Sequence, residues 1–263
     1  MTPVLYGAFV FSMGLCVGSF LNVCIYRIPR GQSIVFPASY CPKCGKSIAW
    51  YDNIPVLGYI LLGGKCRKCR QGISPRYPAI EFFHAAGWAW LYWHYGVSWT
   101  AAAGMILFSI LLAVTMTDLE TGYINDRLTF FGAGAGILLS GVFPELQGKY
   151  SPLDGALFSL LGLLAGGFLL YVTGTVGNWF YRRDTMGGGD VKLLAMMGAF
   201  MGPQNAFFIY LFAPVSALPF ALFLKFFKRA ETIPYGPFLA FTGMVFFLFG
   251  NRIIGRIFPT YGA

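Results

Sequence analysis

Few residues of this sequence carry a charge. Only 11% of its 263 residues are Asp, Glu, Lys or Arg, whereas 57% are hydrophobic and the mean hydropathy is +0.63. This composition excludes an ordinary soluble domain and is typical of a polytopic membrane protein. We therefore expect an all-α chain whose main solvent is the lipid bilayer.

Acidic residues are fewer than basic residues. Ten Asp and Glu residues stand against 19 Lys and Arg residues, giving a net charge of +9. The basic residues gather in a few segments between apolar runs, which is explained by membrane orientation and not by nucleic-acid binding. No basic residue precedes the first apolar segment and no clear cleavage site follows it. We therefore expect a retained first span rather than a cleaved signal peptide.

The apolar runs predict about eight transmembrane helices, because a run of about 20 apolar residues crosses a bilayer. The sixth run, 191–201, is too short by itself, so a crossing there has to begin near Thr185. A break is expected at Gly202-Pro203, and both chain ends are expected outside the cell. The predicted spans are 4–28, 79–95, 99–117, 128–143, 153–181, 185–201, 206–226 and 235–249.

Residues 29–78 are the one water-soluble module, and their many basic residues predict a cytoplasmic location. Cys41-Pro42-Lys43-Cys44 and Cys66-Arg67-Lys68-Cys69 form two C-x-x-C knuckles within this module. This spacing brings four thiolates into a tetrahedron around zinc. Disulfides are the alternative, disfavoured in a reducing cytosol, and a redox pair needs only one knuckle. We predict a structural zinc held by Cys41, Cys44, Cys66 and Cys69, since four cysteines leave no open position.

A second motif, Gly187-Gly188-Gly189-Asp190, places an acid after three glycines at the mouth of an apolar run. Acids at a membrane are costly and are therefore functional by default. Glycines permit close approach of another chain to the backbone. The alternative interpretation is a glycine-rich loop that carries a solvated Asp.

The predicted topology puts Asp118 and Asp190 at the same cytoplasmic edge. Two adjacent carboxylates share a proton, so one can act as base on a water while the other acts as acid, as in aspartyl peptide hydrolysis. A proton or ion pathway is one alternative, and a plain cap at Asp118 is another. Asp126, Glu120 and Asp184 are weaker candidates for the pair.

These motifs together resemble a type IV prepilin peptidase, a GxGD aspartyl membrane protease. The resemblance rests on Gly187 to Asp190, Asp118-Leu119-Glu120 and both cysteine knuckles, and it extends over most of the chain. It implies that Asp118 and Asp190 form the catalytic dyad. The implied substrate is a prepilin or pseudopilin whose short basic leader is cut at the cytoplasmic face of the bacterial inner membrane. Asn125-Asp126 departs from the family, which often has a proline there.

The resemblance also implies methylation of the new N-terminal amine by S-adenosylmethionine. No dinucleotide-type glycine loop marks a site for this methyl donor. Glu81 lies where the resemblance places a residue linked to methylation, so it is the candidate for cofactor binding. A structural role, as an ion pair with Arg76 or as a charge at a helix N-terminus, is the alternative. His84 is interpreted as a satisfied interfacial histidine.

The predicted organisation has three parts: a first span in 1–28, a methyltransferase-associated zinc loop in 29–78 and a peptidase bundle in 79–263. A peptidase without methyltransferase activity is the second interpretation. A proton-coupled transporter is a distant third, because the sequence shows no paired broken helices in two halves.

Overall fold

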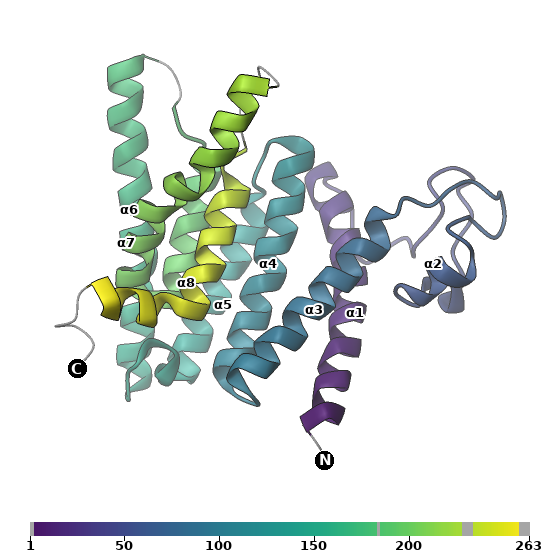
Figure 1. Cartoon of the computed structure of the whole chain (residues 1–263), viewed down its shortest axis with the longest axis horizontal. Helices are drawn as coiled ribbons and strands as arrows, with labels where there is room; N and C mark the ends of the chain where they lie inside the picture. Colours follow the sequence, from purple (N-terminus) through teal and green to yellow (C-terminus); the bar gives the residue numbers. More distant parts are fainter. Residues whose placement is uncertain (1–2, 183–184, 228–233, 258–263) are drawn as a thin grey trace. The chain divides into compact units, whose positions relative to one another are not determined.

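The computed structural model describes residues 3–182, 185–227 and 234–257. Within these residues the chain forms eight α-helices and three short 3-10 helices, with no β-strand (Figure 1). The prediction of an all-α protein is therefore confirmed.

Four helices in the described part of the chain are long and apolar enough to cross a membrane. They are α1 (Pro3–Arg27) with the turn η1 (Ile28–Arg30) that follows it, α4 (Trp99–Thr121), α6 (Pro152–Tyr181) and α8 (Gly236–Ile257). The other long helices are α3 (Arg76–Tyr95), α5 (Asp126–Val142) and α7 (Gly188–Phe227). The chain is thus an integral membrane protein, and its eight predicted crossings stay a prediction.

The chain divides into two compact units, residues 1–113 and 114–263, with the boundary inside α4. In the first unit α1 packs along α3. A Cβ on Gly14 would come within 2.8 Å of the Ala85 backbone, and one on Gly18 within 2.9 Å of the Glu81 backbone. Glycine on α1 is therefore needed for this close packing.

A buried polar cluster in the first unit surrounds His84, which is completely shielded from solvent. Its Nδ1 donates to the Gly14 carbonyl at 2.7 Å, and its Nε2 lies 2.8 Å from Ser109 Oγ. The Trp88 indole N–H also donates to Ser109 Oγ, at 3.1 Å. Both ring nitrogens of His84 thus have partners, as expected for a structural histidine, although the residue is fully buried rather than interfacial.

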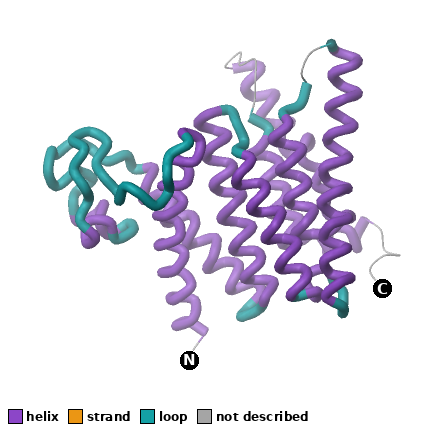
Figure 2. The backbone as a smooth tube through the Cα atoms, turned by 180° about the vertical axis from the view of Figure 1, so that it is seen from behind, coloured by secondary structure: helices purple, strands orange, loops and turns teal. Residues whose placement is uncertain are grey.

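After η1, the loop that leads to α3 holds two short helices, η2 (Trp50–Asn53) and α2 (Leu57–Leu61), and is otherwise irregular (Figure 2). The buried side chain of Arg27 fixes its beginning, because the guanidinium donates to the carbonyls of Ser33 (3.0 Å) and Ala38 (3.5 Å). The bonds close the loop against the end of α1.

In the second unit, α6 and α7 approach each other through glycines. A Cβ on Gly162 would collide with the Gly198 carbonyl, and a Cβ on Gly198 would collide with the Gly162 carbonyl. Ser159 Oγ adds a hydrogen bond to the Ala199 carbonyl at 2.6 Å. Small residues that let backbones meet are the usual basis of helix packing in membranes.

Helix α7 is interrupted at Gly202, whose φ of 78° and ψ of 173° are not helical, and Pro203 follows it. The predicted break at Gly202-Pro203 is confirmed. The helix begins at Gly188, three residues later than the predicted start at Thr185. Consecutive glycines are poor helix formers, which explains the late start. Asp190 therefore lies in the first turn of α7.

We expect Gly162→Ala to lower the free energy of unfolding by about 1–3 kcal/mol, because the added methyl forces α6 and α7 apart. Gly134→Ala on α5 is the matched control, since a Cβ there meets no described atom within 4 Å. Thermal unfolding in one detergent measures both. Equal melting temperatures for the two variants would show that the backbones do not need to approach this closely.

Candidate functional site

Asp118 lies near the C-terminal end of α4. The sequence placed the end of this helix at Thr117, but it continues to Thr121, so Asp118 is helical and only 6% exposed. The backbone N–H of Gly236, the first residue of α8, faces its carboxylate. Oδ2 is buried and accepts no regular hydrogen bond from the described residues. Burying a carboxylate oxygen without a hydrogen-bond donor costs free energy, and a bound water or substrate could supply the missing donor.

Asp190 lies within electrostatic range of Asp118, so the negative charge of Asp118 acts on the Asp190 carboxylate. The backbone N–H of Asp190 donates to the Gly187 carbonyl at 3.1 Å, which closes the first turn of α7. The two predicted residues therefore lie within electrostatic range of each other, although they are far apart in the sequence. Both belong to the second unit.

The buried side chain of Ile124 lies between the starts of α7 and α8. A Cβ on Gly189 would come within 2.7 Å of Ile124 Cβ, and a Cβ on Gly236 within 3.0 Å of Ile124 Cδ1. A Cβ on Gly236 would also come within 2.6 Å of Asp118 Oδ2. Glycine at both helix starts is thus what lets them pack on the segment that follows Asp118.

The glycines before Asp190 differ in their surroundings. Gly189 packs on Ile124, whereas a Cβ on Gly188 would meet no described atom within 4 Å. A Cβ on Gly187 would lie 3.1 Å from Asp190 Oδ2. One glycine therefore serves packing, one lies beside the carboxylate, and Gly188 leaves open space next to the acid.

Two residues of the site were not predicted from the sequence. The Tyr235 phenol lies close enough to Asp190 for the two groups to interact electrostatically. The next residue, Gly236, packs against the Asp118 carboxylate. The only signal for them was Tyr235-Gly236-Pro237 at the start of the last apolar run. A phenol beside a carboxylate can donate a hydrogen bond to it or to a bound substrate.

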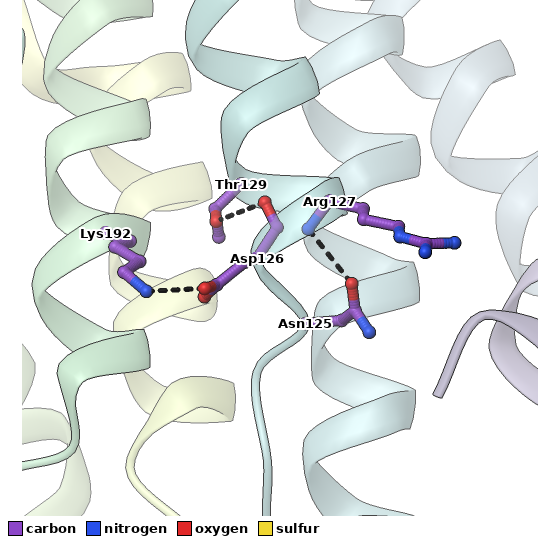
Figure 3. Close-up of polar contacts among 5 residues, drawn as sticks. All are labelled: Asn125, Asp126, Arg127, Thr129 and Lys192. Carbon is purple, nitrogen blue, oxygen red and sulfur yellow. Dashed lines mark hydrogen bonds and ion pairs between the residues drawn. The ribbon is translucent and has the colours of Figure 1, made fainter. Parts of the chain in front are cut away.

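Asp126, a weaker candidate for the pair, has another partner (Figure 3). Its Oδ2 lies 2.6 Å from Lys192 Nζ, an ion pair that joins α5 to α7. Asn125 caps α5 by accepting the Arg127 N–H at 2.9 Å, and Thr129 Oγ1 donates to the Asp126 carbonyl at 3.0 Å. Asn125-Asp126, the departure from the family pattern, thus starts a regular capped helix.

The remaining weaker candidates are not in this arrangement. Glu120 is exposed, and Asp184 lies outside the described residues. Among the described acids, Asp118 and Asp190 both lie next to the packing of Ile124 on the helix starts, and the charge of Asp118 acts on Asp190. Such a pair can share a proton, so that one carboxylate takes a proton from water while the other donates one.

The four knuckle cysteines of the first unit come together as predicted. Their Sγ atoms all lie within 4.8 Å of one another, and Cys41 Sγ is 3.9 Å from Cys69 Sγ. A tetrahedral zinc with bonds of about 2.3 Å separates its sulfur ligands by roughly 3.8 Å. The cluster therefore fits a zinc ion.

Both knuckles use the same turn. The Gly45 N–H donates to the Cys41 carbonyl at 2.8 Å, and the Arg70 N–H donates to the Cys66 carbonyl at 2.9 Å. Gly45 and Arg70 both have left-handed backbones, with φ of 69° and 62°. In the second turn the backbone N–H groups of Cys69 and Lys68 lower the pKa of the Cys66 thiol to about 7. Such a thiol is readily ionised to the thiolate that binds metal.

Glu81 is buried in α3, with 8% of its surface exposed. Its Oε2 accepts the Val56 backbone N–H at 2.8 Å, and the Ser19 side chain also hydrogen-bonds the carboxylate. Val56 has φ of 61°, which is strained for a β-branched residue. Glu81 therefore holds the loop in a conformation that it would otherwise avoid.

Comparison with known families finds two matches. Residues 12–95 match the model described as the bacterial peptidase A24 N-terminal domain, and residues 105–222 match the type IV leader peptidase family. The first match contains the four cysteines and Glu81, and the second contains Asp118 and Asp190. The two matches therefore cover all the predicted site residues.

Several curated proteins are similar over most of their length. A protein of Klebsiella pneumoniae is 38% identical over 77% of this chain and 88% of its own length. Proteins of Pseudomonas aeruginosa and Neisseria gonorrhoeae are each 32% identical, over 95% and 92% of this chain and 93% and 90% of their own lengths. All three are named prepilin leader peptidase/N-methyltransferase. No solved structure matches the chain.

We predict one zinc per chain, and we expect Cys41→Ser or Cys69→Ser to lose it, because a closed site needs all four thiolates. Cys16→Ser is the control, since Cys16 is an exposed free cysteine of α1 outside the cluster. Elemental analysis of protein purified without chelator measures the zinc. Metal-free wild-type protein, or full zinc content in Cys41→Ser, would contradict the assignment.

Proposed function

Because this chain belongs to the type IV leader peptidase family, we propose that it cleaves the leader peptide of prepilins or pseudopilins and then methylates the new N-terminal amine. The observation that carries the proposal is that Gly189, next to Asp190, packs on Ile124 in the segment that follows Asp118, within the part of the chain that the family model matches. The methyl group comes from S-adenosylmethionine.

Hydrolysis is assigned to Asp118 and Asp190. The ionised carboxylate takes a proton from a water, which attacks the scissile carbonyl, while the protonated partner donates its proton to the carbonyl oxygen. The unpartnered Oδ2 of Asp118 supports its role as the group that binds the water. Since a side chain on Gly188 would meet nothing, the substrate backbone has room to lie beside Asp190 there.

The membrane arrangement is part of the proposal. The chain crosses the inner membrane of a bacterium eight times, and its active site opens on the cytoplasmic side. The concentration of basic residues in 29–78 supports this orientation. The functional division follows the same scheme: a first span in 1–28, a zinc loop linked to methyl transfer in 29–78, and the peptidase bundle in 79–263.

Methyl transfer is assigned to the first part of the chain. Zinc at the four cysteines has a structural role, because it fixes a loop that has little secondary structure of its own. Glu81 contributes by positioning: its carboxylate connects α3 to the loop at Val56 and to α1 through Ser19. A displaced loop would misplace whatever groups bind the methyl donor.

We expect Asp118→Asn and Asp190→Asn each to lower the cleavage rate by about 10²–10⁴-fold, because an amide cannot act as acid or base. Asp126→Asn is the control, since it weakens the ion pair between α5 and α7 and leaves both carboxylates of the dyad in place. Purified protein and a prepilin in detergent serve for the assay. Near wild-type cleavage by either dyad variant would overturn the assignment.

Glu81 is tested with two substitutions in an assay that scores both cleavage and label transfer from S-adenosylmethionine. Glu81→Ala should reduce methyl transfer and leave cleavage largely intact, because the Val56 N–H loses its acceptor. Glu81→Gln should recover most of the methyl transfer, since its amide oxygen can accept the same bond. If Gln is as damaging as Ala, the negative charge itself is required, as direct contact with the cationic donor would need. Loss of both activities would instead indicate a role in folding.

A further inference from the structure

The zinc loop exposes large apolar side chains that neither the proposed hydrolysis nor the zinc site uses. Trp50 of η2 is 81% exposed and Leu61 of α2 is 79% exposed. Leu57 and Ile60 are also exposed, and together with Leu61 they occupy i, i+3 and i+4 positions on one face of α2. These four side chains, Trp50, Leu57, Ile60 and Leu61, are called the apolar ridge below. Exposed apolar patches usually mark a surface that binds something.

The ridge is held rigidly. Gly58 of α2 packs so closely on η2 that a Cβ there would collide with the Asp52 carbonyl. The Arg67 guanidinium binds both Asp52 carboxylate oxygens, at 2.6 and 2.8 Å, which ties η2 to the second cysteine knuckle. The bond from the Val56 N–H to Glu81 ties the other side to α3. The ridge is therefore a fixed feature of the zinc loop.

The charge of the loop decides which partner fits. Residues 29–78 contain eight basic residues and one acid, Asp52, which is already paired with Arg67. A zinc ion with four thiolates adds a charge of only −2, so the loop stays strongly positive. A prepilin leader, expected to be basic, would be repelled by this charge. Apolar side chains surrounded by basic ones match the acyl and phosphate layers of an anionic lipid surface.

The position of the ridge within the first unit agrees with such a surface. The segment that carries α2 connects the end of α1 to the start of α3 (Figures 1 and 2). Helix α1 is long and apolar enough to span the bilayer. The loop is tied to Arg27 at the end of α1 and to Glu81 near the start of α3, so it begins and ends close to the headgroup layer on that side of the membrane.

We propose that the apolar ridge inserts into the anionic headgroup layer of the bilayer that holds α1, with the basic residues of the loop on the lipid phosphates. The zinc loop is then an interfacial module, held at the membrane surface. This proposal does not depend on the peptidase or methyltransferase assignment, since it rests on exposure, charge and the placement of the loop.

Fluorescence of the full-length, zinc-loaded protein tests the insertion in nanodiscs that hold one copy of the chain. The difference between wild type and Trp50→Phe isolates the signal of Trp50. In discs of phosphatidylcholine and phosphatidylglycerol, lipids brominated near the headgroup should quench this signal, and aqueous iodide should not. Quenching by iodide alone, or quenching by lipid only after prepilin is added, would overturn the proposal; the second result would assign the ridge to the substrate.

Trypsin digestion of the basic loop gives an independent readout. In the same anionic discs, the double variant Leu57→Glu/Leu61→Glu should be cut in the loop at least about tenfold faster than wild type, since full burial of even one leucine is worth that factor. Val97→Glu is the control, because Val97 is equally exposed in the short connection between α3 and α4. Zinc content shows that each variant is folded. Equal loop cleavage in wild type and a zinc-loaded double variant would refute insertion.

Discussion

The close packing of two helix starts on Ile124 is the constraint on which the candidate active site depends. Gly189 before Asp190 and Gly236 at the start of α8 both approach the segment after Asp118 more closely than any residue with a side chain allows. Two carboxylates repel each other, so only a rigid backbone arrangement can keep them together. The glycines supply that arrangement, and they do so for steric reasons and not through flexibility.

The zinc loop solves a different problem. It has too few regular elements to form a core of its own, and its backbone includes a strained Val56. Three kinds of contact replace a core: four thiolates that can share a metal, the ion pair between Asp52 and Arg67, and the bond from Val56 to Glu81. Helix α2 lies next to the Asp52–Arg67 ion pair and the Val56–Glu81 hydrogen bond, and neither contact covers its apolar side chains, which stay exposed.

Most buried polar groups in the described helices have internal partners; the exceptions include Asp118 Oδ2, Asp126 Oδ1 and Asn205 Oδ1. His84 uses both ring nitrogens, and Arg27 is satisfied by loop carbonyls. Lipid offers no hydrogen bonds, so an unpartnered polar atom there is expensive. Asp118 Oδ2 is one of these unpartnered atoms, and it belongs to one of the two acids to which the proposed hydrolysis is assigned.

The sequence by itself determined the all-α class, the cysteine cluster and the two acids, because these follow from composition, from C-x-x-C spacing and from motifs that are local in the chain. The tertiary structure alone decided how they are used. Only the structure shows that Asp126 forms an ion pair with Lys192, and that Tyr235 and Gly236 lie near the two acids. It also gave Glu81 a partner in a loop 25 residues away. Such contacts depend on which helix ends meet in space, and hydrophobic periodicity does not encode that.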